Sequence, residues 1–243
     1  GFLPERHGII ANAFFDPELN VNFARLVHGE QEMIFLAPVK PGDTIRTVLK
    51  IASVEEKSTG ELFTTETRSE NQHGEPVVRT LSTFFIRGEG SGKSRKPAAE
   101  TDPPRETFLF TREMKVKENQ TYIYAEGSGD HNPIHVDPEF AAKVGLPGII
   151  LQGLCTMAFC FKAVQDGACG GDPQGVRRLK VRFAKPVLPL DTVTTRVWTE
   201  AGDGPGETTL LGFDAVNQNG EVVIKNGQAE VASTPGPAEA GVS

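Results

Sequence analysis

The sequence is poor in the features that mark disulfide-linked, metal-binding and membrane-spanning proteins. It has three cysteines, Cys155, Cys160 and Cys169, which lie in one mostly apolar stretch without a CxxC or HxxxH spacing. We therefore interpret them as reduced thiols and expect neither a disulfide nor a metal site. No apolar run approaches the ~20 residues of a membrane-spanning helix, and the first residues do not resemble a signal peptide. The sequence thus predicts a cytoplasmic protein with no membrane span.

Positive charge is also in short supply. Lysine and arginine total 25 against 32 aspartate and glutamate residues, which gives a formal net charge of −7. This balance argues against nucleic acid as a partner, although a local basic patch for a phosphorylated ligand is compatible with it. The 243 residues, of which 38% are hydrophobic, are enough for one large or two smaller domains.

Large apolar side chains are almost absent from residues 88–107, which read GEGSGKSRKPAAETDPPRET. Such a segment cannot bury enough surface to offset its ordering entropy, so we predict a linker there and a disordered tail over 234–243. The linker separates an N-terminal unit, 1–87, from a C-terminal unit, 108–233.

Most of both units has a strand-like pattern. Residues 1–30 look irregular, and Asn71 to Gly74 and Asn219-Gly220 are turn signals. Asp137 and Pro138 suit the start of a short helix, and residues 153–164 are apolar nearly all round, which predicts a buried helix. Strands are predicted over 31–51 with a break at 41–43, and over 62–70, 77–87, 177–183, 192–200, 208–217 and 221–232.

The two units repeat one another. Three residues near the end of the first unit recur at an offset of 146: Gln72, Gly74 and Glu75 match Gln218, Gly220 and Glu221. Six more recur at an offset of 148: Phe35, Pro38, Val39, Pro41, Asp43 and Thr44 match Phe183, Pro186, Val187, Pro189, Asp191 and Thr192. We infer two fused copies of one strand-turn-strand unit.

The repeat also predicts an asymmetry between the units. The helix over 153–164 maps onto residues 5–16, where Pro4, Gly8 and Pro17 make a buried helix unfavourable. The positions equivalent to Asp130 and His135 fall before residue 1. We therefore expect one active site per chain and a first unit that is incomplete at its start.

The candidate chemistry lies in Gly129-Asp-His-Asn-Pro-Ile-His. Asp130 and His135 flank an Asn-Pro turn, because the Pro133 ring biases Asn132 away from helix. Such a turn can direct a carboxylate and an imidazole into one cavity for acid–base catalysis. The alternative is a solvated loop held by Asx-turns. His131 competes with His135, but it directly follows Asp130 and should point away from it.

Gly153 opens the apolar helix. A helix N-terminus offers unpaired N–H groups and partial positive charge, and glycine lets a ligand approach the backbone. A thioester oxygen docked there would be polarised as it gains charge. The alternative is a glycine needed only for helix packing.

These segments resemble those of a known family. Residues 124–141, YAEGSGDHNPIHVDPEFA, resemble the signature of the MaoC-like dehydratases, the R-specific enoyl-CoA hydratases or hydratase 2. LQGLCTM at 151–157, FAKPVLPLDT at 183–192 and LVHGEQE at 26–32 are similar to other parts of its two-domain members. The resemblance implies an α+β double hot-dog fold, in which antiparallel sheet wraps a central helix. It also implies that the first repeat lacks a site and leaves space for the acyl chain.

The resemblance also implies roles for single residues. Asp130 and His135 would be the catalytic pair, with Asn132 supporting them and the Gly153 N–H in an oxyanion hole. Gln152 stands where the family commonly has histidine, and we retain it as a substrate-binding candidate. Arg178 and Lys180 alternate with apolar residues along a predicted strand, so they either bind CoA phosphates or form a solvated outer face.

The predicted function is reversible hydration of a trans-2-enoyl-CoA to the (3R)-3-hydroxyacyl-CoA, with the CoA thioester as substrate and no cofactor. The alternatives are an acyl-CoA-binding module without activity and a dehydratase of (3R)-hydroxyacyl-carrier-protein substrates. A homodimer is an open alternative to a monomer. The C-terminal Ala-Gly-Val-Ser differs from the peroxisomal Ser-Lys-Leu, so the cytoplasm is favoured over the peroxisome.

Overall fold

The computed structural model describes residues 26–88, 107–204 and 208–232. The predicted linker, except for its two end residues, and the predicted tail lie outside these ranges. Residues 5–16, where we expect no helix, also lie outside these ranges.

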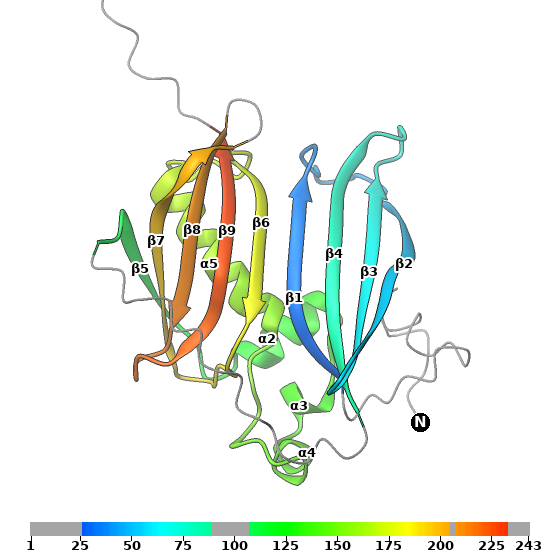
Figure 1. Cartoon of the computed structure of the whole chain (residues 1–243), viewed down its shortest axis with the longest axis vertical. Helices are drawn as coiled ribbons and strands as arrows, with labels where there is room; N and C mark the ends of the chain where they lie inside the picture. Colours follow the sequence, from blue (N-terminus) through cyan, green and yellow to red (C-terminus); the bar gives the residue numbers. More distant parts are fainter. Residues whose placement is uncertain (1–25, 89–106, 205–207, 233–243) are drawn as a thin grey trace, which may run out of the picture.

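The chain forms one nine-stranded antiparallel sheet with the strand order β2-β3-β4-β1-β6-β9-β8-β7-β5 (Figure 1). The N-terminal half supplies β1 (Leu26–Phe35), β2 (Arg46–Lys57), β3 (Gly60–Glu70) and β4 (Pro76–Arg87). The C-terminal half supplies β5 (Phe110–Lys115), β6 (Val176–Phe183), β7 (Thr192–Asp203), β8 (Thr208–Val216) and β9 (Val222–Ala232). The expectation that residues 1–30 are irregular is wrong at its end, because Leu26 already pairs with β4.

The pairing register confirms the internal repeat. In the first half Phe35 pairs with Val78, and at the equivalent place in the second half Phe183 pairs with Ile224. The two halves meet where β1 and β6 pair, with Met33 opposite Leu179. Outward from this junction, β6-β9-β8-β7 mirrors β1-β4-β3-β2, with β5 as an additional edge strand, and the fold is the expected double hot-dog.

The repeated residues build the same hydrogen-bonded corner twice. In the first half Asp43 accepts the Lys40 N–H at 2.8 Å and the Gln72 side-chain N–H at 3.0 Å, and Gln72 accepts the Thr44 N–H at 3.0 Å. The same three bonds in the second half, at 2.8, 2.7 and 2.9 Å, join Asp191, Leu188, Gln218 and Thr192. The aspartate and glutamine are thus the same in both halves because their side chains accept backbone N–H groups that the turn leaves unpaired.

One long helix, α5 (Gly153–Ala168), lies against the sheet of the C-terminal half. It is longer than the predicted helix over 153–164, and it contacts β5, β6, β7 and β9. Its buried residues include Cys155, Met157, Cys160 and Val164, which pack with sheet residues such as Leu179 in one core. Within residues 26–88 the structure has four strands and no helix.

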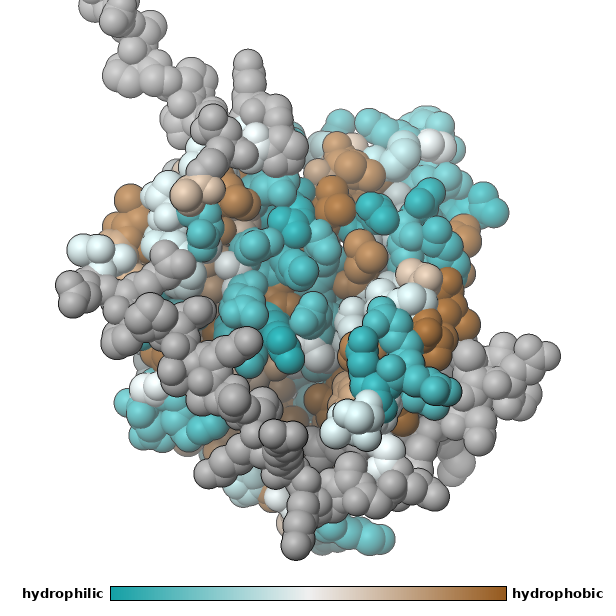
Figure 2. All heavy atoms as spheres, viewed as in Figure 1, coloured by the Kyte–Doolittle hydropathy of each residue, from teal (hydrophilic) through white to brown (hydrophobic). Residues whose placement is uncertain are grey.

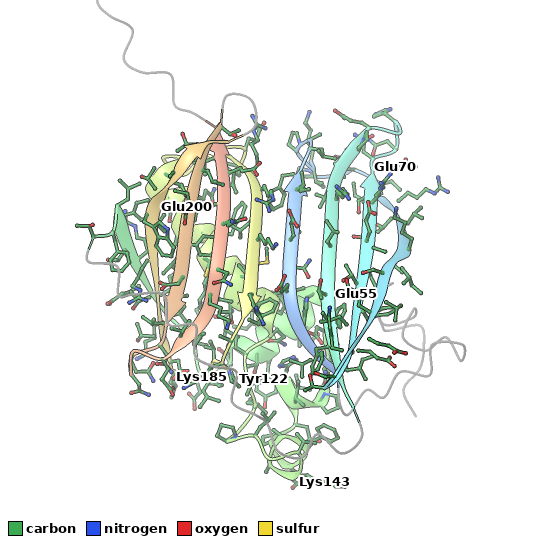
Figure 3. All side chains as sticks on the ribbon, in the orientation of Figure 1. Glu55, Glu70, Tyr122, Lys143, Lys185 and Glu200 are labelled. Atoms are coloured by element: carbon green, nitrogen blue, oxygen red, sulfur yellow. The ribbon has the colours of Figure 1, made fainter. Side chains whose placement is uncertain are left out.

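Three short helices lie below the junction of the halves in Figure 1: α2 (Gln120–Ser128), α3 (Pro133–Val136) and α4 (Pro138–Lys143). Helix α2 is not predicted from the sequence, because its residues QTYIYAEGS include β-branched and aromatic types that favour strand. Thr121 and Ala125 of this helix are buried, whereas Tyr122, labelled in Figure 3, is exposed. Gly129 ends α2 in the left-handed conformation, with φ of 76°.

Candidate active site

The loop after α2 carries the predicted catalytic pair. Asn132 is extended, at φ −55° and ψ 128°, as expected before Pro133, and α3 begins at that proline. The Asn132 side chain caps α3 by accepting the Ile134 N–H at 3.3 Å, while its own N–H donates to Asp130 Oδ1 at 3.3 Å. Asn132 therefore ties the acid to the helix that carries His135.

The imidazole of His135 faces the carboxylate of Asp130. His135 Nε2 lies 3.8 Å from Asp130 Oδ2, and His135 Nδ1 lies 2.7 Å from the carbonyl oxygen of Ile150. A carbonyl oxygen only accepts, so Nδ1 carries the hydrogen and the Nε2 lone pair faces Asp130. The His135 side chain is 9% exposed and that of Asp130 46%, so the acid is open to solvent and the imidazole is not.

The environment of His135 keeps its ring neutral. Burial lowers the pKa of His135 below its ordinary value, and this effect outweighs the charge of Asp130 and the hydrogen bond to Ile150, which both raise it. A neutral imidazole with a free Nε2 can accept a proton at neutral pH.

His131 lies elsewhere. Its Nε2 atom is 3.9 Å from Glu126 Oε1, and its side chain is 45% exposed. The structure therefore places His135, and not His131, against Asp130, as the spacing predicts. The catalytic role of the pair stays a prediction.

The segment from Ile150 to Gly153 holds both members of the pair. Ile150 fixes the His135 ring, and the buried Gln152 side chain donates to the carbonyl oxygens of Thr121 at 3.0 Å and Asp130 at 3.4 Å. Its Nε2 is thus engaged by backbone, while its Oε1 is buried without a hydrogen-bond partner in the part of the chain that the structure describes. Gln152 positions the Asp130 loop, and its predicted contact with substrate stays a prediction.

Gly153 is the first residue of α5, directly after Gln152. Its N–H has no intrahelical partner, as at any helix start, and it lies one residue from the Gln152 side chain that holds the Asp130 loop. A Cβ on Gly153 would lie 3.1 Å from the Phe183 ring. A side chain here would therefore need the Phe183 ring to shift by a few tenths of an ångström, so packing favours glycine, and the predicted role in an oxyanion hole is separate from this preference.

His28 of β1 brings the N-terminal half to the site. Its ring lies 4.6 Å from that of Phe84 and 4.9 Å from that of Phe183, between centroids. Burial lowers the pKa of His28 to about 4, against a smaller opposing effect from hydrogen bonds and the charge of Asp130. Its Nε2 is buried and has no hydrogen-bond partner among the described residues.

His28 is not predicted as a site residue from the sequence, although it lies in the LVHGEQE segment that resembles the family. Only the pairing of β1 with β6 brings this segment beside Phe183 and within electrostatic reach of Asp130. Tyr124 of α2, six residues before Asp130, is a further neighbour of the site that the sequence does not single out. Burial, with contributions from Cys155 and the Asp130 charge, raises the pKa of Tyr124 to about 12.

Arg178 and Lys180 lie on the other face of β6. They alternate with Leu179 and Val181, which belong to the core beneath α5. Figure 2 shows hydrophilic residues gathered over β9 and β6 on this face. Arg178 pairs with Glu32 of β1 at 2.5 Å and with a glutamate of β9 at 3.2 Å. The structure therefore does not bring these two residues to the Asp130–His135 pair, and their binding of CoA stays a prediction.

Within residues 26–88, 107–204 and 208–232, no group of three or more histidine, cysteine or acidic side chains is arranged to hold a metal ion. No helix within those ranges is long and apolar enough to cross a membrane.

Comparison with known proteins gives matches in both halves of the chain. Residues 99–211 match the model of the MaoC like domain, and residues 5–80 match that of the FAS1-like dehydratase domain region. A "Probable enoyl-CoA hydratase 2" of Dictyostelium discoideum is 32% identical over 88% of this chain and 71% of its own length. The "3-hydroxyacyl-thioester dehydratase Y" of Mycobacterium tuberculosis is 33% identical over 86% of this chain and 73% of its own.

Among solved structures, the crystal structure of a MaoC-like dehydratase from Phytophthora capsici superposes with a TM-score of 0.76. It is 34% identical in sequence, and the match covers 88% of this chain and 74% of that one. Both repeats of the present sheet therefore have a counterpart in a known fold.

Proposed function

The chain belongs to the MaoC-like dehydratase family, and on this basis we propose that it hydrates a trans-2-enoyl-CoA reversibly to the (3R)-3-hydroxyacyl-CoA. The observation that supports this most directly is the 3.8 Å approach of His135 Nε2 to Asp130 Oδ2. This separation is too long for a direct hydrogen bond, but it lets both groups bind the same water or hydroxyl. The start of α5 is tied to the same loop.

The reaction follows from these positions. The thioester oxygen accepts the Gly153 N–H, and the positive end of α5 favours the charge that develops on that oxygen. Water held by the pair attacks C3, so an O–C3 bond forms while the C2–C3 π electrons shift toward the thioester. The pair takes one proton from the water, and C2 receives one, which restores the thioester carbonyl.

The tautomer of His135 favours its Nε2 as the proton acceptor in hydration. Nδ1 is occupied by the Ile150 carbonyl, and the lowered pKa leaves Nε2 unprotonated at neutral pH. The imidazolium that forms is stabilised by the Asp130 carboxylate and holds the proton that C2 needs. The Asn132 N–H donates to the Asp130 carboxylate and the Gln152 side chain donates to the Asp130 backbone carbonyl, so both position the acid.

Replacing the acid tests the proposal. Asp130→Asn keeps the size of the side chain but removes its charge, so kcat for crotonyl-CoA should fall about 10²- to 10⁴-fold. The exposed neighbour provides a matched control, since His131→Ala should retain wild-type activity. The loss of the enoyl-thioester absorbance measures the rate, chiral chromatography the product, and circular dichroism the fold.

Near-normal turnover by Asp130→Asn, or a (3S) product, would contradict the proposal. Binding of crotonyl-CoA by the wild type without hydration would instead support the acyl-binding module. Rates on matched CoA and carrier-protein thioesters decide between the hydratase and the carrier-protein dehydratase.

The proposed chemistry is an addition of water with two proton transfers and no net oxidation or reduction, so it calls for a CoA thioester and no redox or metal cofactor. We keep the predicted cytoplasmic location, with the peroxisome as the alternative. A homodimer likewise stays an alternative to a monomer.

A further inference from the structure

The side chain of Gln152 does not cap the helix that it precedes. Gln152 occupies the N-cap position of α5, with φ −56° and ψ 135°, but its side chain accepts no N–H group of the helix. The usual N-cap residues accept an N–H group of the first turn through a side-chain oxygen. The N–H groups of Gly153 and Leu154 are thus left without an acceptor from the cap, and the amide of Gln152 is directed elsewhere.

The Gln152 amide holds two backbone carbonyls that lie far apart in the sequence. Its Nε2 donates to the carbonyl oxygens of Thr121 at 3.0 Å and Asp130 at 3.4 Å. Thr121 lies in the first turn of α2 and Asp130 lies two residues beyond the end of that helix. The chain therefore doubles back along α2, so that both oxygens meet one nitrogen. Carbonyl oxygens only accept, so the amide must present its NH2 group, which has one hydrogen for each of them.

This orientation leaves the amide oxygen of Gln152 unpaired. The residue is 1% exposed, and its Oε1 has no hydrogen-bond partner among the described residues. An unpaired buried oxygen lowers stability, so packing alone would not select this side chain. Violations of such local rules are expected at functional sites. The orientation of the amide is therefore set by the two carbonyls that it holds.

The same residue is fixed to the start of α5. The Gln152 backbone carbonyl accepts the N–H groups of Cys155 at 3.0 Å and Thr156 at 3.1 Å, and the Leu151 N–H before it donates to the Val187 carbonyl at 2.7 Å. The next peptide N–H along the chain is that of Gly153, the proposed oxyanion donor. One side chain thus joins the residue that supplies the acid to the turn that supplies this donor.

We infer that Gln152 is a positioning residue, which fixes the Asp130 carboxylate relative to the Gly153 N–H and makes no contact with the substrate. Both hydrogens of its amide nitrogen face backbone carbonyls, so a contact with substrate would have to break one of these bonds. The inference rests on the proposed hydratase function and assigns a further residue to its site.

Replacing the amide by an apolar side chain of similar size tests this role. Gln152→Met removes both hydrogen bonds, so the acid is no longer held at its distance from Gly153. With crotonyl-CoA as the substrate, kcat should fall about 10- to 100-fold while KM changes less than about twofold. Absorbance of the enoyl thioester measures both constants, and circular dichroism checks the fold.

Gln165 offers a matched control in the same helix. Its side chain also donates to a backbone carbonyl, that of Gly171, at 2.7 Å. It lies 12 residues after Gly153, which is about 18 Å along the helix. Gln165→Met removes the same kind of bond and should keep the kcat and KM of the wild type.

A pH profile gives a readout that a merely structural role would not move. In Gln152→Glu the introduced carboxyl is buried beside two carbonyl oxygens, which raises its pKa above the ordinary value. It donates one hydrogen bond while protonated and none once ionised. The ratio of its kcat to that of the wild type should therefore fall at least about tenfold between about pH 5.5 and about pH 8.5. Asp130, His135 and Tyr124 are present in both proteins, so the ratio cancels their own titration, and the ratio for Gln152→Met should stay flat.

Several results would overturn the inference and leave the hydratase function intact. These are an unchanged kcat in folded Gln152→Met, an equal loss in Gln165→Met, and a raised KM with unchanged kcat, which would show a contact with substrate. If Gln152→Met does not fold, the pH profile of Gln152→Glu decides, and a flat ratio overturns the inference. Failure of the wild type to hydrate crotonyl-CoA and longer enoyl-CoAs would overturn the function itself, and the inference with it.

Discussion

Two imidazoles and one carboxylate dominate the electrostatics of the site. His28 and His135 come from different halves, and burial lowers the pKa of both rings, while the charge of Asp130 opposes that effect in each. At neutral pH both rings are uncharged, and the Asp130 carboxylate faces His135 and acts on His28 through its charge. Such a site is suited to holding a transient imidazolium next to a carboxylate.

The buried His28 should make stability depend on pH. Its pKa is about 4 in the folded protein and about 6.5 when unfolded, so between these values only the unfolded chain binds the proton. Unfolding is then favoured as pH falls, and the free energy of unfolding should drop by up to roughly 3 kcal/mol between pH 6.5 and pH 4. His28→Phe should remove much of this drop, as measured by denaturant unfolding.

His73 is the control for this prediction. It is exposed in the turn between β3 and β4, so His73→Ala should keep the wild-type pH dependence. An unchanged slope in His28→Phe would show that His28 is not the group that resists protonation. His135, whose pKa is also lowered, contributes a remaining dependence of the same sign.

At the scale of elements, the repeated turns show why certain residues are identical in the two halves. Asn71 Oδ1 accepts the N–H groups of His73 and Glu75 at 3.0 and 3.1 Å. Asn217 Oδ1 accepts those of Asn219 and Glu221, both at 3.0 Å. Each asparagine thereby satisfies two backbone donors in a hairpin turn that ends with glycine at positive φ.

Replacing either asparagine should lower the free energy of unfolding by the same amount. Asn71→Ala and Asn217→Ala each leave two donors without their acceptor, so each should lower the free energy of unfolding by about 1–3 kcal/mol. Asn219→Ala, at an exposed turn position, should have a much smaller effect. Chemical denaturation of the three variants measures the change in free energy of unfolding. If only one of the two asparagine variants is destabilised, the two hairpin turns are not equivalent.

At the scale of the whole molecule, the junction of β1 and β6 makes one sheet of two repeats. Arg178 lies at this junction and joins three strands, since it pairs with Glu32 of β1 and Glu230 of β9. All three side chains are mostly buried. Loss of the cation would leave two carboxylates near one another without a counter-charge.

Arg178→Met should therefore lower the free energy of unfolding by about 3 kcal/mol. The KM for crotonyl-CoA, measured where the variant is folded, should stay unchanged, because the guanidinium faces away from α5. Lys180→Met is the matched control, since Lys180 makes no ion pair within the part of the chain that the structure describes, and it should be near neutral for stability. A raised KM in both variants would instead support their predicted binding of CoA.

The sequence itself determined the local elements and the repeat. Alternating apolar residues predict most strands to within a few residues, and the apolar run from Gly153 predicts the buried helix, because local periodicity follows the geometry of each element. The Asn-Pro turn between Asp130 and His135 is encoded in the same way, since Pro133 restricts its own φ and the residue before it. The helix α2 was missed because β-branched and aromatic residues there favour strand until packing overrides them.

The tertiary structure decided what lies across the junction of the two halves. His28 lies beside Phe183, and Arg178 forms an ion pair with Glu32, because β1 pairs with β6 in one register. Contacts between residues some 150 positions apart depend on strand order and register, which no local pattern encodes. The residue types that can do the chemistry are therefore written in the sequence, and which of them meet is set by the pairing of the two repeats.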